Sequence, residues 1–190
     1  MMKLIAITNR KLCQGDFLSR IEWLAKARPT AIMLREKDLS LEDYEALALK
    51  VSDICRENSV PLIINQNLAV AKKLKLANIH LSMVDFRKNK DELVAFTNIG
   101  ASVHSVSEAI EAEALGATYL VAGHIFSTDS KKGVPPRGLG FLKEVCGAVS
   151  IPVFAIGGIK ETNINEVLAV GASGACIMSS AMTSDSLPAF

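Results

Sequence analysis

The chain has 190 residues, 49% of them hydrophobic, and its 21 basic and 20 acidic side chains leave a formal net charge of +1. This length suits one domain with a sizeable core, and interspersed charges of both signs create no field that would attract nucleic acid or an anionic membrane surface. We therefore expect a single domain over residues 1–190, with neither nucleic acid nor a membrane as a partner.

The cysteines and the hydropathy pattern predict a cytoplasmic protein. None of the four cysteines shows a CxxC or metal-like spacing, and each lies in or beside an apolar segment, which favours buried, reduced thiols. No stretch approaches about 18 uninterrupted apolar residues, and Met1-Met2-Lys3 leads directly into an expected strand. We expect neither a membrane-spanning helix nor a signal peptide. The cysteines are Cys13, Cys55, Cys146 and Cys176.

Eight short runs rich in β-branched residues recur along the chain. Most are nearly continuous in apolar residues, which is typical of parallel strands covered on both faces. The expected strands are residues 4–8, 31–34, 62–64, 79–81, 99–103, 119–122, 153–156 and 175–178.

Amphipathic segments separate these runs. The clearest is 41–56, where apolar residues fall at three- and four-residue steps behind Ser40, a candidate N-cap. Segments 107–115 and 163–170 have the same character. Each ends in a Gly-Ala pair, at Gly116 and Gly171, where glycine is a suitable C-cap.

Regular alternation of eight strands with helices favours a closed (β/α)8 barrel, an α/β fold of the TIM type, over an open doubly wound sheet. The chain is short for such a barrel, and residues 181–190 leave little length for a last helix. We expect a compact barrel with a curtailed eighth helix. A short eighth helix leaves a seam of the barrel uncovered, and a homodimer in which the second subunit covers this seam is possible in such an arrangement.

In such a barrel the active site lies at the C-terminal ends of the strands, and polar residues follow the expected strands there. Arg35 and Lys37 follow strand two, Asn65 follows strand three, and Ser102 lies near the end of strand five. All three histidines, His80, His104 and His124, lie at strand ends. A strand-end arginine generally needs an anionic partner. For Arg35 this partner is Glu36, Asp38 or a substrate carboxylate, and the sequence does not choose among them.

Two segments predict a phosphate site. Gly157-Gly158 after strand seven allows backbone N–H groups to approach an anion, and Ser179-Ser180 after strand eight offers N–H and hydroxyl donors. The loops after these two strands are the recurrent phosphate site of the fold. The alternatives are a tight glycine turn and a helix cap.

His124 lies near the start of a polar, flexible run, 123–133, that carries three hydroxyls, a carboxylate and two lysines. Long loops of this kind in compact domains are usually functional, and a neutral imidazole is suited to proton transfer near neutral pH. The alternatives are a histidine bound to backbone and, at low prior, a metal trio with His80 and His104, which no HxH or HExxH pattern supports.

Short stretches spread over nearly the whole chain carry a resemblance to one superfamily. These stretches are 33–37, 61–65, 79–81, 100–104, 123–126, 128–133, 155–159 and the Gly-Ala pairs at 116–117 and 171–172. In these stretches the chain resembles the thiamine phosphate synthases and TenI proteins. The resemblance implies a (β/α)8 barrel whose site binds a thiazole phosphate through Thr128, Asp129 and Ser130, through Gly158, and through Met178 and Ser179.

Two branches of the superfamily compete. Synthases resemble this chain in Arg35-Glu36-Lys37, their pyrimidine-side motif, and in Asp85, which matches a magnesium ligand. They carry Asp where this chain has Gln66, a poorer magnesium ligand, and Gly-Pro-Ile where it has Gly123-His124-Ile125. The histidine resembles the TenI branch, the thiazole tautomerases, whose proton-shuttling histidine falls at this position.

We therefore expect a thiazole tautomerase of thiamin biosynthesis, an isomerase in which His124 moves one proton of a 2-carboxythiazole phosphate so that its ring becomes aromatic. Arg35 or Lys131 or Lys132 would pair with the substrate carboxylate. No cofactor or resident metal is expected, and Asp85 would be a vestigial magnesium position. The alternatives are a thiamine phosphate synthase, which would need Mg²⁺ and joins a pyrimidine pyrophosphate to a thiazole phosphate, and a non-catalytic regulatory protein of this fold.

Overall fold

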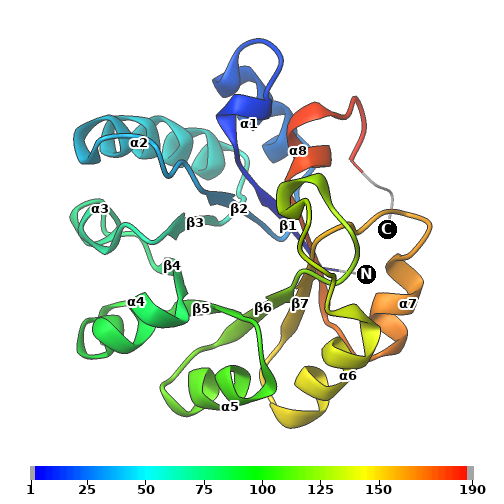
Figure 1. Ribbon diagram of the computed structural model, residues 1–190. Coiled ribbons are helices and arrows are strands. Elements are labelled where there is room, and N and C mark those ends of the chain that lie inside the picture. The colour runs from blue at the N-terminus through cyan, green and yellow to red at the C-terminus, as the bar shows by residue number, and fades with distance from the viewer. Residues whose placement is uncertain (1–2, 188–190) are drawn as a thin grey trace.

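The computed structural model describes residues 3–187, and in them eight parallel strands form a closed barrel surrounded by helices (Figure 1). The strands pair in chain order, and β1 pairs with β8 to close the ring. The predicted (β/α)8 barrel is therefore confirmed. The strands are β1 (Lys3–Ile7), β2 (Ala31–Leu34), β3 (Leu62–Asn65), β4 (Asn78–Ser82), β5 (Asn98–Val103), β6 (Tyr119–Gly123), β7 (Val153–Ile156) and β8 (Gly174–Ile177).

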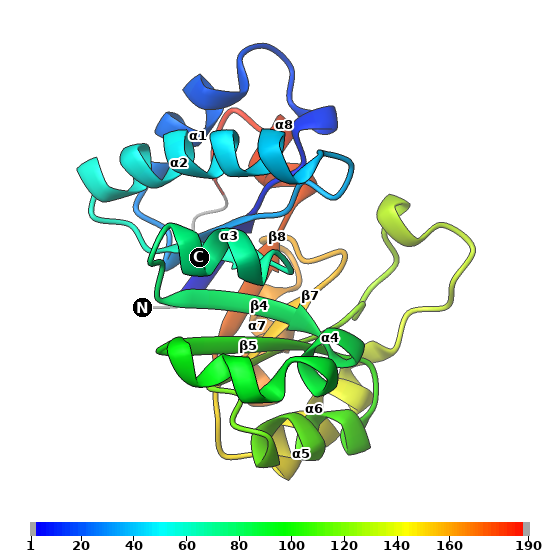
Figure 2. The same cartoon turned by 90° about the vertical axis from the view of Figure 1, so that its left-hand side faces the viewer.

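The helices follow the strands around the outside of the barrel (Figures 1 and 2). Ser40 caps the longest, as predicted, since its side chain accepts from the N–H of Asp43. The α-helices are α1 (Phe17–Lys26), α2 (Leu41–Glu57), α3 (Leu68–Lys73), α4 (Met83–Lys88), α5 (Val106–Ala114), α6 (Gly138–Ala148), α7 (Ile164–Ala169) and α8 (Ser179–Thr183), and the short 3₁₀ helices are η1 (Arg10–Leu12), η2 (Lys90–Ala95) and η3 (Asp129–Lys131).

The last helix, α8, has five residues, in agreement with the expected curtailment. Its carbonyl end is held by α1, because the Arg20 guanidinium donates to the carbonyl oxygens of Ala181 and Ser184. Part of the seam left by the short helix is thus closed within the chain.

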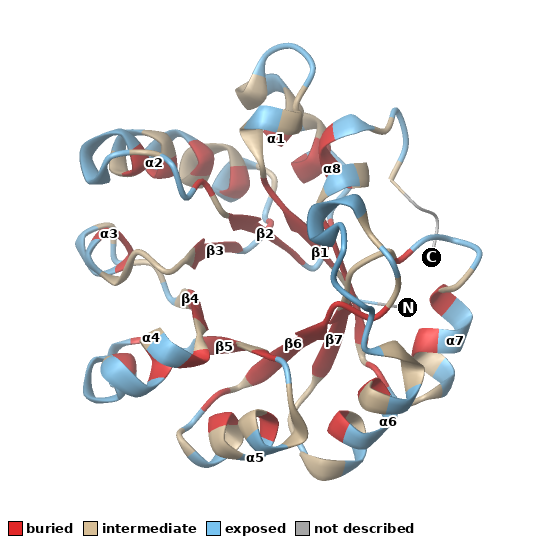
Figure 3. Ribbon diagram, in the orientation of Figure 1, coloured by how far each residue is buried: buried red, intermediate tan, exposed pale blue. Residues whose placement is uncertain are grey.

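Buried apolar side chains form two layers, and Figure 3 shows the buried strands at the centre of the ring. Alternate strand residues face opposite sides, so that Ala6 packs outward against the helices while Ile5 and Ile7 fill the barrel interior. The interior layer draws on β1, β2, β3, β6, β7 and β8. β4 and β5 contribute polar residues instead, which makes one wall of the interior polar.

Two expectations need correction at the level of single residues. β4 continues to Ser82, so that His80 lies inside this strand and not at its end. Of the four cysteines, all of them unpaired, Cys55 and Cys176 are buried but Cys13 and Cys146 are only half-buried, because they lie outside the strands and inner helix faces. No helix among the described residues is long and apolar enough to cross a membrane.

Candidate active site

A cavity of about 820 Å³ opens at the C-terminal ends of the strands. It collects side chains from strands distributed around the barrel, and every residue that the sequence predicted for the site lines it. These residues are Arg35, Lys37, Asn65, Ser102, His124, Thr128, Asp129, Ser130, Lys131, Gly157, Gly158, Met178 and Ser179. The structure thus brings these residues together around one cavity, while their roles in binding and catalysis stay predictions.

The cavity is lined by five basic side chains and one carboxylate, that of Asp129. Their mutual influence is visible at Lys37, where burial lowers the pKa, the charges of Arg35 and Lys131 lower it further, and Asp85 opposes them. Because the positive charges in this cavity outnumber the negative ones, the cavity attracts a ligand that carries negative charge. Sequence reasoning missed Lys160, which lines the cavity from the turn after β7.

Arg35 faces the cavity because its acidic neighbours bind elsewhere. Glu36 is buried, with 3% of its surface exposed, and accepts from the Thr8 hydroxyl at 2.7 Å and from Arg10 through the backbone N–H and Nη1. Asp38 accepts from both terminal nitrogens of Arg10 at 2.6 and 2.8 Å, which holds the pKa of this carboxyl well below its usual range. Two of the three partners left open for Arg35 are therefore engaged by the loop after β1.

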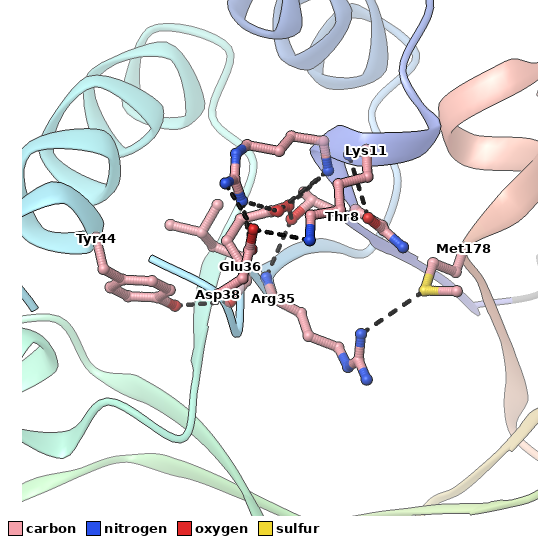
Figure 4. A network of polar contacts seen from close by, with 10 residues as sticks. Thr8, Lys11, Arg35, Glu36, Asp38, Tyr44 and Met178 are labelled. Carbon is pink, nitrogen blue, oxygen red and sulfur yellow. Dashed lines mark hydrogen bonds and ion pairs between the residues drawn. The ribbon is translucent and has the colours of Figure 1, made fainter. Parts of the chain in front are cut away.

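Figure 4 shows the consequence: the Arg35 side chain extends away from the Glu36 and Thr8 cluster toward Met178. Its Nη1 lies 4.0 Å from the sulfur of Met178, which follows β8, and β8 and β2 are the two neighbours of β1 in the barrel. Its backbone N–H donates to the Thr8 hydroxyl oxygen at 3.0 Å, and this hydroxyl donates to Glu36. The same cluster thereby fixes the backbone from which Arg35 and Lys37 enter the cavity.

The glycine turn after β7 is required by its packing. Gly157 and Gly158 have φ of +99° and +67°, and a Cβ on either would lie 2.3 Å from His124 Cβ or 2.5 Å from the Ser127 carbonyl oxygen. The N–H of Ile125 also donates to the Ile156 carbonyl at 2.9 Å. The tight-turn interpretation therefore holds for both glycines, and both also line the cavity, where a phosphate role stays a prediction.

His124 is almost buried, and its Nε2 lies 3.2 Å from the carbonyl oxygen of Val134. Two backbone hydrogen bonds close the segment that follows it, from Arg137 N–H to the His124 carbonyl and from Gly138 N–H to the Ile125 carbonyl. Figure 2 shows this segment projecting beyond the ends of the strands, and its residues 127–134 line the cavity. One ring nitrogen of His124 is thus engaged by the backbone of its own loop.

All three histidines line the cavity, but their ring nitrogens have different partners. His104 Nδ1 lies 2.9 Å from the Gly123 carbonyl oxygen, whereas His80 lies inside the barrel between Ser102 and Tyr119. Among the described residues there is no group of three His, Cys, Asp or Glu side chains that could hold a metal ion. No sequence pattern marks Tyr119 as more than a residue of the expected strand 119–122.

Asp85 lies beside the cavity and not in its lining. Its Oδ2 accepts from the Ser82 hydroxyl at 2.6 Å and from the Gln66 amide at 3.0 Å, and Gln66 has a left-handed φ of +68°. The Gln66 amide thus occupies the position next to the carboxylate where a second carboxylate would be expected in a site built for a divalent cation.

The fold and the cavity define a (β/α)8 barrel with a basic site above its strands, the class in which phosphate groups are bound by the last loops. A family model described as thiamine monophosphate synthase matches residues 4–181, and the chain therefore belongs to this family.

Similar proteins of known name span nearly the whole chain. The thiamine-phosphate synthase of Clostridium acetobutylicum is 36% identical over 188 residues, 97% of this chain and 89% of the relative. That of Fusobacterium nucleatum is 36% identical over 180 residues, 93% and 87% of the two chains. The solved structure of thiamine phosphate pyrophosphorylase from Pyrococcus furiosus aligns with a TM-score of 0.82 at 30% identity and covers 97% and 89%.

These relatives overturn the expected thiazole tautomerase. That expectation relied on single positions, Met33, Gln66 and His124, whereas near-full-length relatives are named synthases. A histidine at a strand end does not by itself indicate proton transfer, and here one of its ring nitrogens, Nε2, lies 3.2 Å from the Val134 carbonyl oxygen. The isomerase assignment is therefore wrong.

Proposed function

We propose that this protein is a thiamine-phosphate synthase, a transferase that joins a hydroxymethylpyrimidine diphosphate to a thiazole phosphate and releases diphosphate. The observation that carries the proposal is the excess of positive charge in one cavity, where five basic side chains meet a single carboxylate. A substrate pair with a diphosphate and a phosphate supplies the matching negative charge.

Two groups of lining residues suit the two substrates. Arg35 and Lys37, held by the Glu36 cluster, would bind the diphosphate of the pyrimidine. The glycine turn after β7 and Ser179 after β8 would bind the thiazole phosphate, which agrees with the recurrent phosphate position of this fold. Lys131, whose charge reaches Lys37, would lie between them.

The reaction needs little from the protein beyond positioning and charge. The bond between the pyrimidine methylene carbon and the diphosphate oxygen breaks with its electron pair on the oxygen, and the thiazole ring nitrogen forms the new bond to this carbon. Cationic side chains stabilise the charge that develops on the leaving diphosphate. Closeness of the two substrates supplies much of the remaining acceleration.

This function implies Mg²⁺, and the donor set fits an ion that arrives with the diphosphate. Mg²⁺ in such sites is held by one or two carboxylates together with substrate phosphates and water. Asp85 offers one carboxylate, which would hold the ion together with the substrate diphosphate, while the Gln66 amide nitrogen donates to this carboxylate. When bound, Mg²⁺ supplies additional neutralisation of the diphosphate charge.

The test is an assay of the purified chain with pyrimidine diphosphate, thiazole phosphate and Mg²⁺, in which diphosphate release and thiamine phosphate are measured. We expect Arg35→Ala to raise the KM for the pyrimidine diphosphate by about 10-fold or more, the loss of one charge-assisted contact. Arg56→Ala, an exposed arginine on α2, is the matched control and should leave the KM unchanged. A folded wild-type chain that releases no diphosphate would refute the proposal.

Three expectations remain predictions: the cytoplasmic location suggested by the unpaired cysteines, the homodimer, and a thiazole phosphate as the small-molecule partner.

A further inference from the structure

A buried polar trio crosses the interior of the barrel beneath the cavity. His80 on β4 lies between Tyr119 on β6 and Ser102 on β5, with Nδ1 at 3.2 Å from the Tyr119 hydroxyl and Nε2 at 2.8 Å from the Ser102 hydroxyl oxygen. His80 and Tyr119 are 2% and 7% exposed. Neither residue has a role in the proposed function as stated so far, and polar groups at this depth are retained only when they are well paired.

The sheet makes room for this trio at Gly100. In the strand register Gly100 is the neighbour of His80 on one side and of Tyr119 on the other. A Cβ at Gly100 would lie 2.1 Å from Tyr119 Cζ and 2.4 Å from His80 Nδ1. The missing side chain on β5 is therefore what allows two side chains from β4 and β6 to meet across it.

The hydrogen-bond partners determine where the imidazole proton lies. Burial lowers the pKa of His80 to about 3, so the ring is neutral near pH 7 and carries one N–H. In the described part of the chain, the hydrogen-bond partner of the Tyr119 hydroxyl is His80 Nδ1. A buried hydroxyl proton needs an acceptor, and Nδ1 serves as one only if the ring proton is on Nε2.

The proton on Nε2 then points at Ser102, whose oxygen accepts it. A hydroxyl that accepts from one side keeps its own proton for a different acceptor. Ser102 lines the same cavity as Arg35, Lys37 and Asn65. Its proton is therefore available to an acceptor atom of a ligand in this cavity.

We propose that Tyr119 and His80 are positioning residues that fix the Ser102 hydroxyl as a hydrogen-bond donor toward an acceptor atom of the pyrimidine diphosphate. The identity of this ligand rests on the proposed function. The direction of the hydrogen bonds does not, because it follows from the buried trio alone.

The first experiment reads the tautomer without any substrate. In the full chain labelled with [¹⁵N]histidine, we expect the His80 signals at pH 7 to show a protonated Nε2 and an unprotonated Nδ1, assigned by their loss in His80→Gln. Tyr119→Phe, which keeps the ring and its edge contact with Phe154, should move the signals away from this pure tautomer. Tyr44→Phe, which also removes a buried tyrosine hydroxyl, should leave them unchanged. A wild-type His80 protonated on Nδ1 would overturn the proposal.

The second experiment reads the effect on binding. Tyr119→Phe should raise the KM for the pyrimidine diphosphate about 5- to 10-fold, as expected for one weakened hydrogen bond, and leave the KM for the thiazole phosphate unchanged. Ser102→Ala should do the same, and the double variant should be no worse than Ser102→Ala, because both changes remove one donor. Fully multiplicative effects would contradict the proposal. If the wild-type chain had no synthase activity, the proposed function would fail while the tautomer measurement would still decide the direction of the hydrogen bonds.

Discussion

Glu36 offers the sharpest test of how the site is held. In Glu36→Gln the side chain keeps its shape and loses its charge, and one of the two terminal atoms becomes an N–H₂ group. The carboxylate accepts from the Thr8 hydroxyl, from the Arg10 backbone N–H and from Arg10 Nη1. An amide can keep the first two bonds through its oxygen, but its nitrogen then faces the guanidinium.

The expected cost follows from these contacts. Hydrogen bonds to a charged group contribute about 1.5–3 kcal/mol each, and the lost bond lies at a side chain that is 3% exposed. We expect Glu36→Gln to lower the free energy of unfolding by about 2 kcal/mol, which corresponds to a fall in Tm of about 4–8 °C for a chain of this size. Because the cluster also fixes the Arg35 backbone, the KM for the diphosphate substrate should rise.

Urea denaturation followed by circular dichroism measures the change. The matched control is Glu57→Gln, the same substitution at the exposed end of α2, which should stay within about 0.5 kcal/mol of the wild type. A loss below 0.5 kcal/mol in Glu36→Gln would refute the reasoning that the buried carboxylate organises the loops after β1 and β2.

Three further predictions concern other parts of the structure. Gln66→Asp should give the free protein a divalent-cation site beside Asp85, measured as Mn²⁺ binding by electron paramagnetic resonance at least 10-fold tighter than in the wild type without substrate; equal affinities would contradict this. Gly157→Ala forces a Cβ to within 2.3 Å of a neighbouring side-chain carbon at φ +99° and should cost about 2–4 kcal/mol, whereas Gly140→Ala, which meets no atom within 4 Å, should not destabilise. Because the His80 pKa falls to about 3 in the fold, its stabilising contribution is complete above about pH 6.5 and is lost as the pH falls below it, by about 1.4 kcal/mol per pH unit. His80→Gln should flatten this dependence in thermal unfolding between pH 6.5 and pH 4.5, and an unchanged slope would count against it.

The barrel was predictable because its strands are short and apolar on both faces. Runs such as 119–122 and 153–156 cannot be exposed on either side, which requires a sheet covered by helices outside and side chains inside. Once the barrel is given, chain topology alone brings residues as distant as Arg35 and Ser179 to one cavity.

The sequence could not tell which way individual side chains point. His80 is followed by two more strand residues, and its inward direction depends on a register that only the paired strands fix. The partners of Arg35 were equally undetermined, because Arg10, which engages both acidic neighbours, lies on a different loop. The prediction of a tautomerase had the same weakness. It relied in part on His124, and the sequence does not show that Nε2 of this histidine contacts the Val134 carbonyl oxygen of its own loop.

The segment between His124 and Gly138 leaves and rejoins the barrel at one place, where two adjacent backbone hydrogen bonds tie its ends together. Because these hydrogen bonds hold the two ends of the loop together, a change in the length of the loop need not move β6 or α6. The entropic cost of closing a longer loop between fixed ends grows only slowly with its length. Residues between 128 and 136 can therefore be inserted, deleted or exchanged while the barrel stays intact. This makes the segment a natural position at which to graft loops from other family members and so to change which molecules the cavity retains.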